Sequence, residues 1–364
     1  MEAYKGVQTT TIGAWPKGPN NPYEDWFSNP NMSILNAQAA WKAVQAMDPK
    51  QLEELLEAET ERIMRAQKVV GIDIPTDGEV RRISYVHYPC QHVDGIDMDD
   101  MVSVTARDGR WHGYVPTIKE KILAQSKYYL PHDFEVAQKF TDKQVKITTA
   151  GPMTIADSLA DKFYGSDDDL DGPEKYWELV IDIAIALNSE LRALADAGCP
   201  YIQIDEPVFA RYPGRANYRG FEALEICLQG ISSQTTHVLH VCGGYPLALD
   251  DASYEKADKN AYRILAPSIE KSSFQQVSLE HAHEPMDLSV LKMFKNTKVI
   301  LGVVAVAKSD LESVADIRKE LQKARRYINS ERLIAAPDCG LGFLSDDLTM
   351  LKLRNLVEAA HSIR

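Results

Sequence analysis

The strongest constraint on the fold of this chain is a regular alternation of short β-rich runs with helical patterns. The runs with the composition of strands are 9–15, 72–79, 145–152, 201–207, 236–244, 274–280, 298–306 and 332–340. Helical periodicity separates them, in 52–70 with its stop at Gly71, in 174–197, in 219–231 and from about Asp346 onward. Strands that alternate with helices form parallel sheets, and eight such units within 364 residues predict an α/β fold, a closed (β/α)8 TIM barrel.

One segment departs from this alternation. Residues 84–132 include VSVTARDGRWHGYV, which is typical of a β-hairpin that turns at Asp108-Gly109. We expect this segment to be an insertion after the second strand. Because no repeat, low-complexity tract or linker interrupts the chain, we expect residues 1–364 to form a single (β/α)8 catalytic domain with this insertion at about 84–132.

Polar residues at the ends of the expected strands indicate where a site would form. In barrels of this type, the active site lies at the C-terminal ends of the strands. Titratable or metal-binding groups occupy these ends: Glu79, Asp205, His240, Cys242, Glu280 and Cys339. Within HVLHVCGGYP, side chains two residues apart share one face of a strand. His240 and Cys242 are therefore expected to point the same way.

Four of these residues have the chemistry of a metal site. His240, Cys242, Glu280 and Cys339 would converge at the barrel mouth, and two thiolates with an imidazole suit zinc. Three firm ligands with one exchangeable position are typical of a catalytic zinc site. The simpler alternative is that each cysteine packs as a small hydrophobe, as we expect for Cys199 and Cys227, and that the histidine is hydrogen-bonded in the core.

Composition excludes several classes of partner. The formal net charge of −13 argues against nucleic acid and anionic membranes. No apolar run approaches the ~18 residues of a membrane span. Five widely spaced cysteines suit reduced thiols rather than a disulfide framework. These features predict a cytoplasmic protein whose partners are small molecules.

Several motifs, in order along the chain, resemble the catalytic barrel of cobalamin-independent methionine synthase. They are TTIGAWPKG, TDGEVRR, AGPMTIADS, YIQIDEPVF, HVCGG, VSLE and APDCGLG, and they span nearly the whole chain. Methionine synthases of this family carry a second, degenerate barrel at the N-terminus, for which this sequence has no room. The chain therefore resembles the single-barrel, core-only form.

The resemblance implies a function and assigns residues to it. It implies zinc bound by His240, Cys242, Glu280 and Cys339, and recognition of the homocysteine amino group by Glu79 and Asp205. Gly13 and Ala14 correspond to the segment that binds the substrate carboxylate. The implied reaction is S-methyl transfer to homocysteine, giving methionine. The substrate thiol would displace the Glu280 carboxylate, because two thiolates and a carboxylate already overcompensate Zn²⁺, and would then attack the methyl carbon as a thiolate.

Differences from the family lie on the donor side and at the carboxylate site. Ala14 replaces a serine, so only backbone N–H groups remain there. Ala305 and Ala307 replace an Asp and a His of the methyl-transfer machinery, which leaves Lys308 as the nearby catalytic candidate. A tryptophan that packs on folate is missing near Ser158. The methyl donor is therefore open between methyl-tetrahydrofolate and a methyl-corrinoid, the latter carried by a corrinoid protein.

Three alternatives follow from the same residues. A relative of epoxyalkane:coenzyme M transferase would use the zinc site to add a sulfonated thiol to an epoxide. Such a thiol lacks an ammonium group, so the presence of Glu79 and Asp205 favours an amino-acid thiol. A non-catalytic zinc-binding homologue would bind metal without thiol transfer. A lyase on a barrel similar to uroporphyrinogen decarboxylase would need no metal and would require basic residues in its cavity.

Overall fold

The computed structural model describes residues 6–23, 42–106, 111–166, 172–246, 248–252, 254–258 and 260–363. Seven parallel strands form one sheet in the order β1-β10-β9-β8-β7-β6-β4. Their bounds are β1 Gln8–Thr9, β4 Lys146–Ala150, β6 Tyr201–Asp205, β7 Thr236–Val241, β8 Gln276–Leu279, β9 Lys298–Val304 and β10 Leu333–Pro337. Each neighbouring pair along this order is parallel, as the alternating sequence predicts.

The ring is completed by the segment that the sequence predicts as the second strand. Parallel bridges join Ile74 to Thr10, beside β1, and Thr76 to Lys146 on β4. The expected strand over 72–79 is wrong in length, because only these two residues pair. Pro75 between them has no N–H group to donate, and the chain then turns away through Gly78 and Glu79, with φ of 75° and 57°.

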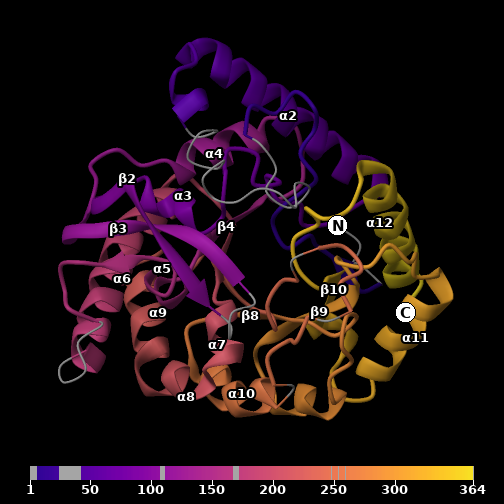
Figure 1. Cartoon of the computed structure of the whole chain (residues 1–364). Coiled ribbons are helices and arrows are strands. Elements are labelled where there is room, and N and C mark those ends of the chain that lie inside the picture. The colour runs from indigo at the N-terminus through magenta and orange to yellow at the C-terminus, as the bar shows by residue number, and fades with distance from the viewer. Residues whose placement is uncertain are drawn as a thin grey trace.

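Helices surround the strands (Figure 1). The longer ones are α2 Pro49–Val70, α4 Leu130–Gln138, α6 Gly172–Asp196, α9 Phe221–Leu228, α10 Ala261–Lys271, α11 Val314–Ala324 and α12 Asp346–His361. The shorter ones are α3 His87–Cys90, α5 Pro152–Ala156, α7 Pro207–Arg211, α8 Pro213–Arg215, the π-helical η1 Ala216–Gly220, and the 3₁₀ turns η2 Leu288–Met293 and η3 Ser330–Arg332. Helix α2 ends at Gly71 with φ of 89°, as its sequence predicts. The helix predicted over 219–231 is shorter, because η1 precedes α9.

A second sheet lies at the side of the barrel, and its two long strands fall within the segment expected as an insertion. β2 Val93–Ala106 and β3 Trp111–Ala124 are antiparallel, and β3 also pairs with β5 Ala160–Asp161. β3 packs against α6, and Figure 1 shows the two long strands crossing beside α3 and α5. The Asp108-Gly109 turn predicted for this hairpin lies outside the described residues. In the described part of the chain, no helix is long and apolar enough to span a membrane.

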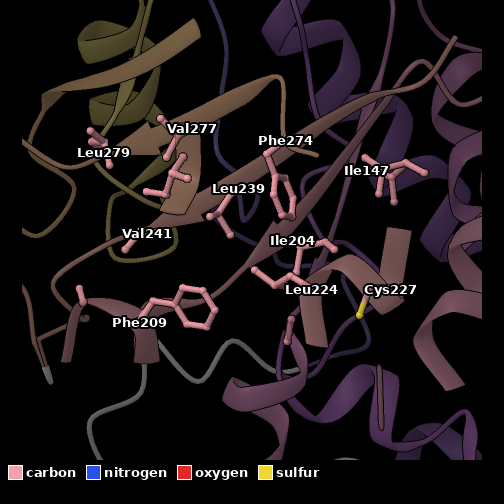
Figure 2. Close-up of a cluster of buried hydrophobic side chains, with 14 of the residues drawn as sticks. Ile147, Ile204, Phe209, Leu224, Cys227, Leu239, Val241, Phe274, Val277 and Leu279 are labelled. Atoms are coloured by element: carbon pink, nitrogen blue, oxygen red, sulfur yellow. The ribbon is translucent and has the colours of Figure 1, made fainter. Parts of the chain in front are cut away.

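The outer face of the barrel strands forms the main hydrophobic core. Figure 2 shows Ile204, Leu239, Val241, Val277 and Leu279 packed beneath the surrounding helices. On β7 and β8 these residues alternate with the polar residues that face the barrel interior. Cys227 lies in the same apolar cluster, and burial raises its pKa well above the ordinary value. Its expected role as a small buried hydrophobe is confirmed.

Candidate metal and substrate site

Three of the predicted metal ligands meet at the C-terminal mouth of the barrel. His240 lies near the end of β7, Cys242 follows that strand, and Cys339 follows β10. Their candidate ligand atoms all lie within 4.8 Å of one another. Nε2 of His240 is 3.5 Å from Sγ of Cys339. Because the outward positions of β7 are filled by Leu239 and Val241, the alternation of side chains along this strand points His240 inward.

The imidazole of His240 is oriented by a neighbouring strand. Its Nδ1 lies 2.9 Å from Oγ of Ser278 on β8. This contact occupies one ring nitrogen and directs the other, Nε2, toward the sulfur atoms. A hydrogen bond to the distal ring nitrogen is the usual way in which proteins fix the tautomer and direction of a metal-binding histidine.

The two thiols differ in acidity because they share a hydrogen bond. Hydrogen bonding from Cys339 lowers the pKa of Cys242 well below its ordinary value, with a further contribution from His240. The same contact raises the pKa of Cys339. All five cysteines of the chain are free thiols. The two cysteine sulfurs and one imidazole nitrogen thus lie around a common point, and this donor set suits zinc.

Glu280, the fourth predicted ligand, lies beside this group and its carboxylate has other partners. Oε1 is 2.6 Å from Nζ of Lys256, and Oε2 accepts a hydrogen bond from the Gly243 N–H at 3.2 Å. The structure therefore brings three of the four predicted ligands together, and coordination by Glu280 stays a prediction.

Two buried carboxylates occupy the mouth from other strands. Oε1 of Glu79 accepts a 2.8 Å hydrogen bond from Oγ1 of Thr148 and lies 3.4 Å from Arg82. Oδ1 of Asp205, at the end of β6, accepts one from Gln203 at 2.7 Å. Burial raises the pKa of Asp205 to about 7, the charge on His240 lowers it, and the charge on Glu79 raises it. The charges of His240 and Glu79 therefore both act on the Asp205 carboxyl.

Gly13 and Ala14 line the same mouth through close backbone approaches. A Cβ atom on Gly13 would lie 2.3 Å from Oε1 of Glu79, so a larger residue at this position would displace the carboxylate. The Ala14 carbonyl accepts a hydrogen bond from the Leu341 N–H at 2.7 Å. A Cβ on Gly340, next to Cys339, would lie 3.0 Å from Cβ of Ala14. The first strand segment is thus packed between Glu79 and the Cys339 loop.

Among the described residues, no hydrogen bond or ion pair connects Lys308, the predicted catalytic residue, to the three metal-ligand candidates. Its ammonium donates to the carbonyl of His283 at 3.3 Å. The neighbouring Ala305 is held by the buried Lys352, whose ammonium donates to the Ala305 carbonyl at 3.1 Å. The segment that replaces the family's Asp and His is therefore tied to α12 by this contact.

Several polar residues of the site are missing from the sequence prediction. The Asp338 carboxylate accepts hydrogen bonds from the N–H groups of residues 281–283, at 3.0, 2.9 and 2.6 Å, and so shapes the turn after Glu280. Lys146 lies on β4 with its Nζ unpaired among the described residues, and burial lowers its pKa to about 7. The position of Asp338 beside Cys339 is a signal that could have identified it. Lys256 lies in an irregular loop, where strand register predicts nothing.

Comparison with known proteins shows what the chain as a whole is similar to. Residues 7–362 match the family model described as cobalamin-independent synthase, catalytic domain. The methionine synthase of Sulfurisphaera tokodaii is 26% identical, over 100% of this chain and 94% of that protein. That of Pyrococcus furiosus is 28% identical, over 83% of this chain and 80% of that protein.

Solved structures show the same fold over the full length. A B12-independent methionine synthase from Shewanella sp. W3-18-1, solved in complex with selenomethionine, superposes with a TM-score of 0.82 at 26% identity. The alignment covers 98% of this chain and 97% of that one. A putative vitamin-B12 independent methionine synthase from Listeria monocytogenes has a TM-score of 0.69 at 18% identity, covering 99% and 98%, and this likeness shows the fold.

Proposed function

Because this chain belongs to the cobalamin-independent synthase family, as a catalytic domain, we propose that it transfers a methyl group to the sulfur of homocysteine and so forms methionine. The observation that carries this proposal is the meeting of His240, Cys242 and Cys339 at the barrel mouth, with ligand atoms within 4.8 Å. A relative with 26% identity was solved with selenomethionine, the selenium form of the proposed product.

We propose that His240, Cys242 and Cys339 hold zinc, with Glu280 as the exchangeable fourth ligand. A bound zinc ion would supply the positive charge that keeps a coordinated substrate thiol deprotonated at neutral pH. The chain's own residues supply the rest of the site. Ser278 directs the imidazole, and the burial of Cys242 limits the access of water to its sulfur.

Glu79 and Asp205 are proposed to bind the ammonium group of homocysteine. Both carboxylates are buried, and a buried carboxylate without a cation is costly. Arg82 approaches Glu79, whereas Asp205 accepts only a side-chain amide among the described residues. An incoming ammonium would compensate the second charge. This binding would position the substrate sulfur toward the three ligands, and such positioning accelerates a transfer step.

The methyl donor is proposed to be methyl-tetrahydrofolate or a methyl-corrinoid, in the cytoplasm. Ala305 and Ala307 lack proton-donating side chains. A donor whose leaving group needs no protonation therefore suits this side of the site, and this requirement favours the corrinoid.

The metal site is tested by removing one ligand at a time. We expect the His240→Ala and Cys339→Ser variants to lose both bound zinc, measured by elemental analysis, and methyl transfer. Cys199→Ser is the matched control, because that thiol bonds to the Tyr201 carbonyl at 3.2 Å outside the site. Full zinc content in a His240→Ala/Cys339→Ser double variant would refute the proposed site.

The thiol substrate is tested by comparing homocysteine with a simple alkanethiol. Asp205→Asn should weaken homocysteine binding about 30-fold, since losing a buried charge partner costs about 2 kcal/mol or more. Alkanethiol binding should change little, and equal effects on both would contradict the ammonium site. The zinc-loaded protein is assayed with methyl-folate, methyl-corrinoid and epoxide donors. Turnover only with coenzyme M and an epoxide would replace the proposed function with that of the alternative transferase.

A further inference from the structure

A buried ion pair adjoins the proposed metal site. Nζ of Lys256 lies 2.6 Å from Oε1 of Glu280, and the two side chains are only 7% and 4% exposed. Lys256 belongs to the loop between β7 and α10, fourteen residues after Cys242. Lys256 is neither a proposed metal ligand nor a proposed homocysteine-binding residue, so those roles do not explain why it is buried here.

The position of Lys256 is fixed by the backbone of the Cys242 loop. Its ammonium also donates to the Gly244 carbonyl at 3.0 Å, and the next residue, Ala257, donates its N–H to the Gly243 carbonyl at 2.9 Å. The lysine stem packs on Gly243, where an added Cβ would lie 3.2 Å from the lysine Cβ. These contacts hold the ammonium in place independently of Glu280.

The backbone of Glu280 is equally fixed, and its carboxylate is held by Lys256 and by the Gly243 N–H. The Glu280 N–H donates to Oη of Tyr262 at 3.2 Å, and the Asp338 carboxylate holds the N–H groups of the two residues that follow. A cavity of about 20 Å³ adjoins the carboxylate, with Gly243, Lys256 and Tyr262 among its lining residues. Because the backbone is fixed, an exchange of the carboxylate between this position and the metal would require a rotation of the Glu280 side chain and no movement of the strand.

The charges at the site require a place for this carboxylate. Two cysteine thiolates and Glu280 carry more negative charge than a divalent ion compensates, and a substrate thiolate would add another. A carboxylate that leaves the metal inside the protein is costly unless a cation and hydrogen-bond donors receive it. Lys256 provides this cation, and the Gly243 N–H provides a hydrogen-bond donor.

We propose that Lys256 is a positioning residue that receives the Glu280 carboxylate when the substrate sulfur takes its place at the metal. This inference rests on the proposed function. Lys256 competes with the metal for one carboxylate, so it weakens metal binding in the free protein and strengthens thiol binding. A purely structural ion pair would affect both in the same direction.

The test measures metal and thiol affinity on the full chain, with Lys256→Met as the variant. Competition with a chelator should show zinc bound about tenfold more tightly, because no cation draws Glu280 away, and homocysteine bound about tenfold more weakly. In the Co²⁺-loaded protein, the absorption change caused by homocysteine should need correspondingly more thiol. Lys256→Arg keeps the charge and should restore most of the thiol affinity.

Two further variants separate this role from damage to the fold. Lys323→Met removes the lysine of a half-exposed pair with Glu320, whose atoms are 2.7 Å apart, and should change neither affinity. In a Glu280→Gln background, Lys256→Met should alter thiol binding by no more than about twofold, because the interacting charge is already gone.

Unchanged affinities in Lys256→Met, or loss of zinc and thiol binding together, would overturn the proposal. If the unaltered protein itself binds no zinc or no homocysteine, the proposed function fails rather than this inference alone.

Discussion

Lys352 links the last helix to the segment after β9, and its removal should be costly. Its side chain is fully buried. The ammonium donates to the carbonyls of Ala305 and Asp310 and lies 2.8 Å from Oε2 of Glu312. The other oxygen of Glu312 accepts a hydrogen bond from the Ala305 N–H at 2.8 Å. Lys352→Met would leave two carbonyls without this donor and the carboxylate without its cation.

The size of the effect follows from the burial of the pair. Removing one partner of a buried ion pair costs about 3–5 kcal/mol. Because 21% of the Glu312 side chain is exposed, water offsets part of the loss, so we take about 3 kcal/mol. An unfolding entropy of about 2.1 cal/mol/K per residue gives about 0.76 kcal/mol/K for 364 residues. The expected fall in the unfolding midpoint is therefore about 4 °C.

The assay is thermal unfolding of matched variants at pH 7, followed by circular dichroism. Lys323→Met, which breaks only a half-exposed pair, should shift the midpoint by less than about 1 °C. A Lys352→Met/Glu312→Gln double variant should recover about half of the loss, because no unpaired charge is left. If Lys352→Met unfolds at the same temperature as Lys323→Met, the reasoning from buried charge is wrong.

Two other variants test the site and the pH dependence. Gly13→Ala should raise the KM for homocysteine about tenfold, since its Cβ would displace the Glu79 carboxylate; an unchanged KM would show that Glu79 does not bind substrate. Burial raises the pKa of Glu190 from 4.5 to about 7, although hydrogen bonds from the N–H groups of Leu130 and Tyr129 act to lower it. The folded protein thus holds a proton that the unfolded chain has lost, so stability should fall as pH rises from about 4.5 to 7. Glu190→Gln should reduce this fall in urea titrations, and equal slopes would contradict the assignment.

The regular parts of this structure could be predicted from sequence because each depends on local patterns. Apolar alternation located β7 and β8, and strand register placed His240 and Cys242 on one face. The helix stop at Gly71 follows from the ability of glycine to adopt positive φ. The second strand was predicted too long, because a run of suitable residues does not reveal that Pro75 interrupts the ladder.

The partners of the ligands could not be predicted in the same way. Lys256 contacts Glu280 only because an irregular loop folds back over Gly243, and no periodicity encodes that path. Asp338 binds three N–H groups of a loop more than fifty residues earlier in the chain. Such contacts depend on how loops are arranged around the closed barrel, which residue spacing alone does not specify.

The pairing of β1 with β10 has a consequence for biosynthesis. Gln8 and Thr9 pair with Ile334 and Ala335, and the Val7 N–H donates to the carbonyl of Ala360 at 3.2 Å. Strand β1 is synthesised before the other strands of the sheet, but it can pair with β10 only after β10 has left the ribosome. Cys339 directly follows β10, so the three proposed metal ligands can come together only after β10 has left the ribosome. Until then the partly formed sheet has two open edges, which exposes it to aggregation or to capture by chaperones.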